Sequence, residues 1–244
     1  MKQQIFTIES QTQLAPDVFR LLLTAPEKPQ AVPGQFVNIA LPGRYLRRPI
    51  SVCDVRENTL CLIYKRIGRG TGDLSRMQPK DKLDVLTGLG NGYDLTKSGD
   101  NPLLIGGGAG IPPLYLLARY LLAEGKKVQV VLGFNTASEI FYEKEFKDLG
   151  CSVTLAAADG SAGVKGFVTD ALPDTYSYFY ACGPLPMLKA VCRTAQTSGQ
   201  LSLEERMGCG FGACMGCSIQ TAGGYRRVCK DGPVFEKEEL RWED

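Results

Sequence analysis

The sequence predicts a β plus α/β architecture: an N-terminal antiparallel β-barrel, a doubly wound parallel α/β domain, and a small cysteine-rich segment at the C-terminus. Three observations predict it. Short apolar runs separated by turn pairs come first, strands then alternate with helices, and four cysteines gather near the end. The 244 residues suffice for two domains and an appendage. We expect boundaries at 1–98, 99–200 and 201–244.

The barrel is predicted from closely spaced apolar runs in the first segment. They are punctuated by Pro-Gly and Asn-Gly pairs, which favour tight turns. Several short strands at such spacing are typical of a small antiparallel barrel. The expected strands cover 19–23, 35–40, 49–53 and 60–65, with turns at Pro33-Gly34, Pro42-Gly43 and Asn91-Gly92.

From about residue 99 the periodicity changes to strands that alternate with helices. This alternation predicts a parallel sheet with helices on its faces. The expected strands are 102–105, 128–134, 152–157 and 178–182, and the expected helices are 114–124, 138–149 and 185–197.

The C-terminal cysteines follow the spacing C-x4-C-x2-C-x11-C, which is the thiolate pattern of a plant-type [2Fe–2S] centre. The predicted metal ligands are Cys209, Cys214, Cys217 and Cys229. Glycines between them allow positive φ angles, so that amide N–H groups can face the sulfur atoms. A four-cysteine zinc site is the alternative, although zinc knuckles usually come as two separated C-x2-4-C pairs.

Composition excludes several functional classes. A net charge of +2 gives no reason to expect nucleic acid or an anionic membrane surface as a partner. No apolar run approaches the ~18–20 residues of a membrane span, and the N-terminus resembles no signal peptide. Nine cysteines, an odd number, favour reduced thiols in the cytoplasm. Histidine is absent, so cofactors rather than imidazole should carry the chemistry.

Two motifs join strands to helices in the α/β segment. Gly106, Gly108 and Gly110 precede Pro112-Pro113, where glycines would let a pyrophosphate approach a helix N-terminus. Cys182-Gly183-Pro184 follows another strand, at the sheet edge where α/β folds bind ligands. Taken singly, the first could serve packing only, and the second could be a buried thiol in an ordinary turn.

In the barrel segment, Arg47-Arg48-Pro49-Ile50-Ser51 could place a guanidinium near a phosphate and a hydroxyl near a ring edge. With the two loops, this motif resembles the ferredoxin–NADP reductase superfamily over about residues 5–200. Including the cysteine segment and 225–235, the whole chain resembles the electron-transfer subunits of class 1B dihydroorotate dehydrogenases.

The resemblance implies a bound FAD and NAD as a substrate. It assigns the FAD contacts to Arg48, Pro49, Ile50, Ser51, Lys65, Arg66, Ile67, Gly70, Thr71 and Gly72, and it places the loop 88–93 beside the flavin. It assigns the NAD contacts to Gly106, Gly108, Gly110, Cys182, Gly183 and Pro184. The superfamily usually has Tyr where this chain has Ile50, so aromatic stacking at that position is not expected. NAD is favoured over NADP because 133–136 holds no basic side chain for a 2′-phosphate.

By resemblance, the chain passes electrons from an FMN-containing catalytic subunit through [2Fe–2S] and FAD to NAD+ in pyrimidine (UMP) biosynthesis. The expected assembly is a heterotetramer with two copies of each subunit. Rival interpretations are the small subunit of an NADH-dependent ferredoxin:NADP oxidoreductase or sulfide dehydrogenase. From another class, the rival interpretation is a nucleotide-binding regulatory protein with a four-cysteine zinc site.

Overall fold

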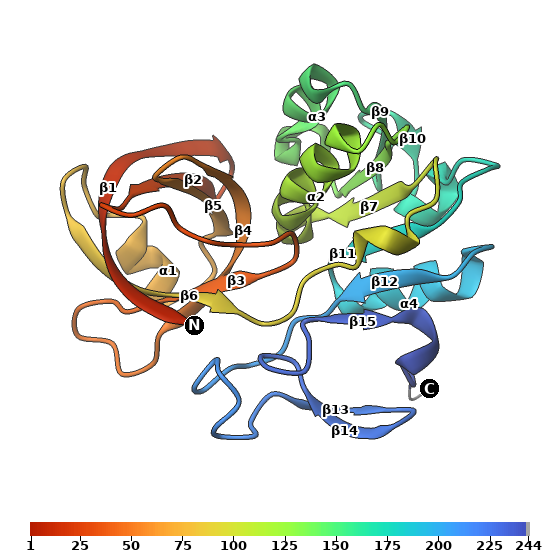
Figure 1. Cartoon of the computed structure of the whole chain (residues 1–244). Helices are drawn as coiled ribbons and strands as arrows, with labels where there is room; N and C mark the ends of the chain where they lie inside the picture. The colour runs from red at the N-terminus through yellow and green to blue at the C-terminus, as the bar shows by residue number, and fades with distance from the viewer. Residues whose placement is uncertain (243–244) are drawn as a thin grey trace.

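The structure is a computed structural model that describes residues 1–242. It has three parts, which Figure 1 shows from red to blue: a closed six-stranded barrel, a seven-stranded sheet covered by helices, and a two-stranded hairpin. The predicted fold class is confirmed.

The barrel closes in the order β1-β2-β5-β4-β3-β6. Its strands are β1 (Lys2–Ala15), β2 (Val18–Thr24), β3 (Phe36–Ile39), β4 (Arg48–Arg56), β5 (Thr59–Lys65) and β6 (Lys82–Leu89). All four predicted strands are present, but β1 and β6 were missed. The strictly alternating burial of β6 matches a period-2 pattern that could have revealed it, whereas β1 is mostly polar and interrupted by two register shifts. The short helix α1 (Arg69–Leu74) buries Leu74 in the barrel core.

The sheet has the order β10-β9-β8-β7-β11-β12-β15 and is parallel apart from β15. Its strands are β7 (Leu103–Gly107), β8 (Gln129–Phe134), β9 (Ser152–Ala157), β10 (Val164–Lys165), β11 (Phe179–Cys182), β12 (Gly199–Ser202) and β15 (Val234–Glu236). The helices are α2 (Pro112–Ala123), α3 (Glu143–Leu149) and α4 (Leu185–Thr194), with 3-10 turns η1 (Leu95–Lys97), η2 (Gly108–Gly110), η3 (Ala137–Glu139), η4 (Val168–Ala171) and η5 (Lys237–Glu239).

Strand alternation places the helices on opposite faces of this sheet. Leu104 and Val130 share a core with α2 and α3, whereas their neighbours Ile105 and Val131 share a core with α4. Both faces are therefore covered, as a parallel sheet requires. Figure 1 shows α2 and α3 on one side and α4 on the other.

The predicted helix over 138–149 is wrong in its first half. The 3-10 turn η3 ends at Glu139, and α3 begins only at Glu143 because Tyr142 adopts a left-handed conformation with φ 65°. This break lets the ring of Tyr142 pack edge-on against Tyr115. Burial of aromatic side chains therefore overrides the helical pattern. The helix predicted over 185–197 also ends earlier, at Thr194.

The cysteine-rich segment contributes a strand to the sheet and is not a separate unit. The hairpin of β13 (Ser218–Thr221) and β14 (Gly224–Arg227) stands alone, but β15 returns to pair with β12. Strand β12 runs across the boundary expected at residue 200. The division into three domains stays a prediction, and main-chain hydrogen bonds cross its second boundary.

Candidate functional site

A cavity of about 580 Å³ lies where the barrel, the sheet edge and the C-terminal segment meet. Nine of the predicted cofactor-binding residues line it. They are Arg48, Pro49, Ile50, Ser51, Lys65, Ile67, Gly70, Thr71 and Cys182. The structure thus brings the barrel motif and one loop of the α/β domain to a single cavity, although more than 130 residues separate Arg48 from Cys182.

Arg48 lies across the start of α1. Its Nη1 donates to the carbonyl oxygen of Leu46 at 2.7 Å. A Cβ at Gly70 would overlap the Arg48 guanidinium, so only glycine admits this approach. The guanidinium is held beside the backbone N–H groups of a helix start, and together they form a surface suited to a phosphate.

Thr71 serves its own helix in this structure. Its Oγ1 accepts from the N–H groups of Ile67 at 3.0 Å and Gly68 at 3.2 Å. Gly72 is buried behind it and does not line the cavity. The hydroxyl therefore shapes the loop 67–70, which does line the cavity.

Arg66 points away from the cavity, unlike its neighbour Lys65. Its Nη2 bonds Asp17 Oδ1 at 2.5 Å, and its guanidinium lies over the Phe19 ring. The structure does not bring Arg66 together with the other predicted FAD contacts.

The two loops of the α/β domain meet at the carboxyl ends of β7 and β11. These strands are adjacent and parallel, with Gly106 opposite Cys182. A Cβ at Gly110 would overlap the Cys182 carbonyl oxygen, so the loops touch through bare backbone. Gly106, Gly108, Gly110, Gly183 and Pro184 do not line the cavity itself, but Ala109 within the glycine loop does.

Residues at and after the end of β12, together with Pro233 before β15, contribute to the cavity and were missed. Ser202, Leu203, Glu204, Glu205, Met207 and Pro233 line it beside Cys182. Burial, followed by the negative charge of Glu204, raises the pKa of the Cys182 thiol to about 12, and Ser202 partly opposes the shift. Surrounding protein also raises the pKa of the Glu204 carboxyl by partly excluding water, although the side chain remains exposed. The apolar-polar alternation 201–204 was the available signal for this strand.

The four C-terminal cysteines form two pairs. In the first, the N–H of Cys209 donates to Cys214 Sγ at 3.4 Å, and the N–H of Cys214 donates to Cys209 Sγ at 3.4 Å. In the second, the N–H of Cys229 donates to Cys217 Sγ at 3.4 Å. All nine cysteines of the sequence are free thiols.

Backbone amides concentrate on one sulfur. Phe211, Ala213 and Cys214 all direct their N–H groups at Cys209 Sγ, at 3.5, 3.2 and 3.4 Å. Burial raises the pKa of Cys209, but these donors outweigh it and bring the pKa to about 6. Burial and then the neighbouring Cys217 thiol raise the pKa of Cys229 to about 12.

These thiols fit a [2Fe–2S] cluster. Four cysteines are its usual ligands, and N–H groups aimed at sulfur stabilise the thiolate form that binds iron. Within residues 1–242, no three His, Cys, Asp or Glu side chains already stand at metal-binding distances from one another. The arrangement is therefore two thiol pairs on a glycine-rich loop, with Gly210 at φ +79° and Gly212 at φ +93°.

The cavity and the cysteine segment share a wall. Phe36, Leu203 and Met207 line the cavity and also belong to the apolar cluster that contains Cys217 and Cys229. Phe36 faces Ser51 across the β3–β4 ladder. The cavity and two of the cysteines thus border the same apolar cluster.

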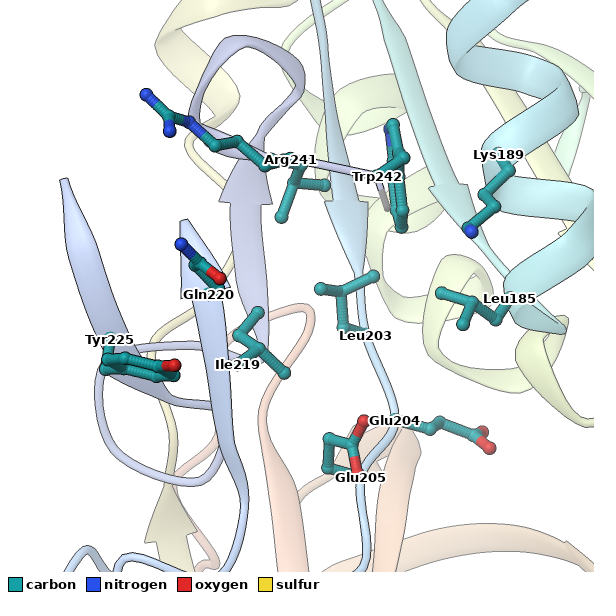
Figure 2. Close-up of a pocket in the computed structure, with 11 residues that line it drawn as sticks. Leu185, Lys189, Leu203, Glu204, Glu205, Ile219, Gln220, Tyr225, Arg241 and Trp242 are labelled. Atoms are coloured by element: carbon teal, nitrogen blue, oxygen red, sulfur yellow. The ribbon is translucent and has the colours of Figure 1, made fainter. Parts of the chain in front are cut away.

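A second cavity, of about 570 Å³, lies between α4, the segment after β12 and the β13–β14 hairpin. Figure 2 shows Leu203, Ile219 and Trp242 around it, with Glu204 and Glu205 at one end. Leu203, Glu204 and Glu205 line both cavities. None of the predicted site residues lines this second cavity.

Comparison with protein families gives two matches. Residues 204–241 match the iron–sulfur cluster binding domain of dihydroorotate dehydrogenase B, and residues 104–193 match an oxidoreductase NAD-binding domain. A protein of Geobacillus sp. (strain WCH70) named dihydroorotate dehydrogenase B (NAD(+)), electron transfer subunit, is 42% identical over 98% of this chain and 99% of its own length. A protein of the same name from Fusobacterium nucleatum is 42% identical over 96% of this chain and 97% of its own.

Solved structures are also similar. An NADH-dependent reduced ferredoxin–NADP oxidoreductase structure superposes with a TM-score of 0.88 and 33% identity, covering 97% of this chain and 90% of the other. A ferredoxin–NADP+ reductase from Neisseria gonorrhoeae with bound FAD and NADP superposes with a TM-score of 0.69 over 80% of this chain and 90% of the other. At 16% identity, this second likeness shows the fold alone.

Proposed function

This chain belongs to the family of electron-transfer subunits of NAD(+)-dependent dihydroorotate dehydrogenase B, and on that premise we propose how its residues serve that task. It is an oxidoreductase subunit that links dihydroorotate oxidation to NAD+ in pyrimidine (UMP) biosynthesis. FAD and a [2Fe–2S] cluster, when bound, supply the conversion between hydride and single-electron transfer.

The observation that carries this proposal is the shared wall of Phe36, Leu203 and Met207. We assign the first cavity to FAD, with Arg48 and the start of α1 at its phosphates and Ser51 toward the flavin ring. The four cysteines would hold the iron on the other side of the wall. Because these side chains are apolar, they would help to exclude water between the two sites.

The glycine loop and Cys182 would hold the nicotinamide nucleotide against the same cavity. Gly110 lets the two loops approach, and Ala109 and Cys182 reach the cavity. The raised pKa of Cys182 keeps its thiol protonated at neutral pH, so this thiol shapes the pocket and carries no charge.

The partner is the catalytic subunit of the same enzyme, and we propose that it holds FMN and assembles as two copies of each chain. The purified chain alone should reduce an artificial dye with NADH but show no dihydroorotate oxidation. Co-expression with the catalytic subunit should restore dihydroorotate-dependent reduction of NAD+. Dihydroorotate turnover by this chain alone would contradict the division of labour.

Preference for NAD over NADP has support at the carboxyl ends of β8 and β9. Glu139 Oε2 accepts from the side-chain amide of Asn135 at 2.9 Å, and Asp159 Oδ1 accepts from the N–H of Ser161 at 2.9 Å. Hydrogen bonding by Ser161 lowers the pKa of Asp159, which is therefore charged at neutral pH. Two carboxyl groups at this edge would oppose a 2′-phosphate.

The test is the ratio of kcat/KM for NADH to that for NADPH. We expect wild type to prefer NADH, and Glu139→Gln to improve the use of NADPH about tenfold by removing one repelling charge. The matched control is Glu143→Gln, which removes a carboxylate paired with Lys147 on α3. Preference for NADPH in the wild-type chain would contradict the proposal.

The rival is the small subunit of an NADH-dependent ferredoxin–NADP oxidoreductase, and the 0.88 TM-score favours its fold equally. Sequence identity is higher to the dihydroorotate dehydrogenase subunits, at 42% against 33%. Reduction of NADP+ by the complex with reduced ferredoxin would support the rival. The zinc alternative predicts a colourless protein without iron.

No helix in residues 1–242 is long and apolar enough to cross a membrane. We propose a cytoplasmic location, supported by the nine free thiols.

A further inference from the structure

A buried asparagine links the barrel to the cysteine loop. Asn38 lies in β3, is 1% exposed, and donates from Nδ2 to the carbonyl oxygen of Cys209 at 3.1 Å. The two residues are 171 positions apart in the sequence. A buried amide on the outer wall of a barrel needs a reason, because an apolar residue would cost less there.

Its neighbours place Asn38 between the two proposed cofactor sites. It pairs across the ladder with Pro49, which lines the first cavity, and with Leu86 of β6. Phe36, two residues earlier and on the same face of β3, is part of the wall shared by the cavity and the thiols.

The contact is fitted closely on the cysteine side. Gly210 follows Cys209 with φ +79°, and a Cβ there would overlap Asn38 Nδ2. The Asn38 amide thus contacts the backbone of the cysteine loop and no side chain at position 210. The Oδ1 atom of Asn38 is also buried and has no hydrogen-bond partner in the described residues. An unpaired acceptor is costly, so the Nδ2 donor rather than the whole amide explains why this residue is there.

The bond also orients the peptide between Cys209 and Gly210. A trans peptide is planar, with its C=O and N–H on opposite sides. With the carbonyl oxygen held toward the barrel, the Gly210 N–H points away from Asn38. The amides of the residues that follow, Phe211, Ala213 and Cys214, converge on Cys209 Sγ.

We propose that Asn38 is a positioning residue that fixes the Cys209–Gly210 peptide and thereby raises the reduction potential of the iron–sulfur cluster. The inference rests on the proposed function, because it needs a cluster on these cysteines. Its physical basis is that donors directed at a ligand favour the more negatively charged, reduced state. Through Asn38, the barrel that would hold the flavin also influences the reduction potential of the iron–sulfur cluster.

The test is a redox titration of the complete complex, followed by the electron spin resonance signal of the reduced cluster. Asn38→Leu keeps the branching of the side chain and removes the donor, although leucine is larger, and Asn38→Asp keeps the shape and replaces the donor by a carboxyl group. At a fixed solution potential, we expect the ratio of reduced to oxidised cluster to fall severalfold in Asn38→Leu and about tenfold in Asn38→Asp. The matched control is Asn58→Leu, in the exposed β4–β5 turn, which should leave the ratio unchanged.

The FAD content of the variants distinguishes this proposal from a purely structural role of Asn38, because a variant that retains FAD has kept its fold. Bound FAD with a lowered cluster potential supports it, whereas bound FAD with a raised potential overturns it. An unchanged potential in folded Asn38→Leu and Asn38→Asp overturns it. If these variants bind no FAD, Asn38→Ser decides: a smaller shift in the same direction supports the proposal, and loss of FAD there as well overturns it. Wild-type protein without iron would instead refute the proposed function.

Discussion

At the scale of single residues, cysteines and glycines have different roles in the two sites. The four C-terminal thiols are the proposed ligands, whereas glycines supply the room that backbone needs to approach backbone. Cys217 is 2% exposed beside Cys229, and Gly110 lies against the carbonyl of Cys182. Substitution of a cysteine and substitution of a glycine should therefore impair different properties of the protein.

Replacement of one proposed cluster ligand should remove the iron–sulfur cluster without affecting the reaction of NADH at the FAD. We expect Cys217→Ser to lose the iron while keeping FAD and the NADH-dependent reduction of dyes, because the cavity lies on the other side of the shared wall. Iron content, FAD content and dye reduction measure this. The control Cys192→Ser, outside the quartet, should keep the iron. Full iron content in Cys217→Ser would show that Cys217 is not a ligand.

Gly110→Ala should impair nucleotide binding. The new Cβ would meet the Cys182 carbonyl oxygen, which is backbone and cannot rotate away. We expect KM for NADH to rise at least tenfold while FAD stays bound. Gly125→Ala is the control, since it has φ +77° and open space around it, so it costs about 1 kcal/mol of stability without affecting KM. An unchanged KM in Gly110→Ala would mean that the loops do not hold the nucleotide.

At the scale of elements, the barrel and the sheet are joined by specific polar contacts. Arg119 on α2 pairs with Asp54 on β4, where Asp54 is 6% exposed. Asn91, after β6, donates to the carbonyl oxygen of Val234 at 2.9 Å and accepts from its N–H at 3.0 Å. With Asn38, these contacts hold the α/β domain and the cysteine segment on the barrel.

Loss of the Asp54 carboxylate should loosen the junction between β4 and α2. Asp54 also accepts from Arg56 Nε at 2.9 Å, so its removal leaves two arginines without this partner. We expect Asp54→Asn to lower the free energy of unfolding by about 1–3 kcal/mol, with Arg119 partly rescued by water. Thermal unfolding measures it. The exposed pair Lys144–Asp148 provides the control, and Asp148→Asn should cost less than about 0.5 kcal/mol.

At the scale of the whole molecule, carboxylates with lowered pKa values govern stability in acid. The Arg47 guanidinium bonds Asp84 at 2.7 Å and holds the pKa of that carboxyl below its usual range. A carboxyl whose pKa is lower in the folded state stabilises the fold above its unfolded pKa of about 3.9 and loses that contribution as pH falls through the folded value. Asp231, bonded by Arg227, behaves in the same way.

We therefore expect Asp84→Asn to melt at a lower temperature than wild type at pH 7. The difference should shrink as the pH falls below about 4 and disappear once the pH lies below the lowered pKa of Asp84, where the wild-type carboxyl is protonated too. Melting curves of both proteins from pH 2 to 8 measure this. A difference that does not shrink between pH 4 and pH 2 would mean that shape rather than charge is responsible.

Local conformational demands could be predicted from the sequence. The cysteine spacing, the glycine loop before α2 and the alternating strands of the barrel each concern residues that lie close together along the chain. Their chemistry needs particular φ angles or ligand intervals, and these leave a pattern in the sequence. The fold class could be predicted for this reason. The assignment of the four thiols to the cluster and of the two loops to the nucleotide rests on the same kind of pattern and stays a prediction.

Contacts between distant segments were decided only by the tertiary structure. The pairing of β15 with β12, the position of Glu204 beside Cys182, and the bond from Asn38 to Cys209 join segments whose own sequences do not indicate their partners. Tyr142 shows the same effect, because burial of its ring overrides a helical pattern. Such contacts depend on which surfaces pack together in the folded core. The free energy of burial depends on how well these surfaces fit, and not on how far apart they lie in the sequence.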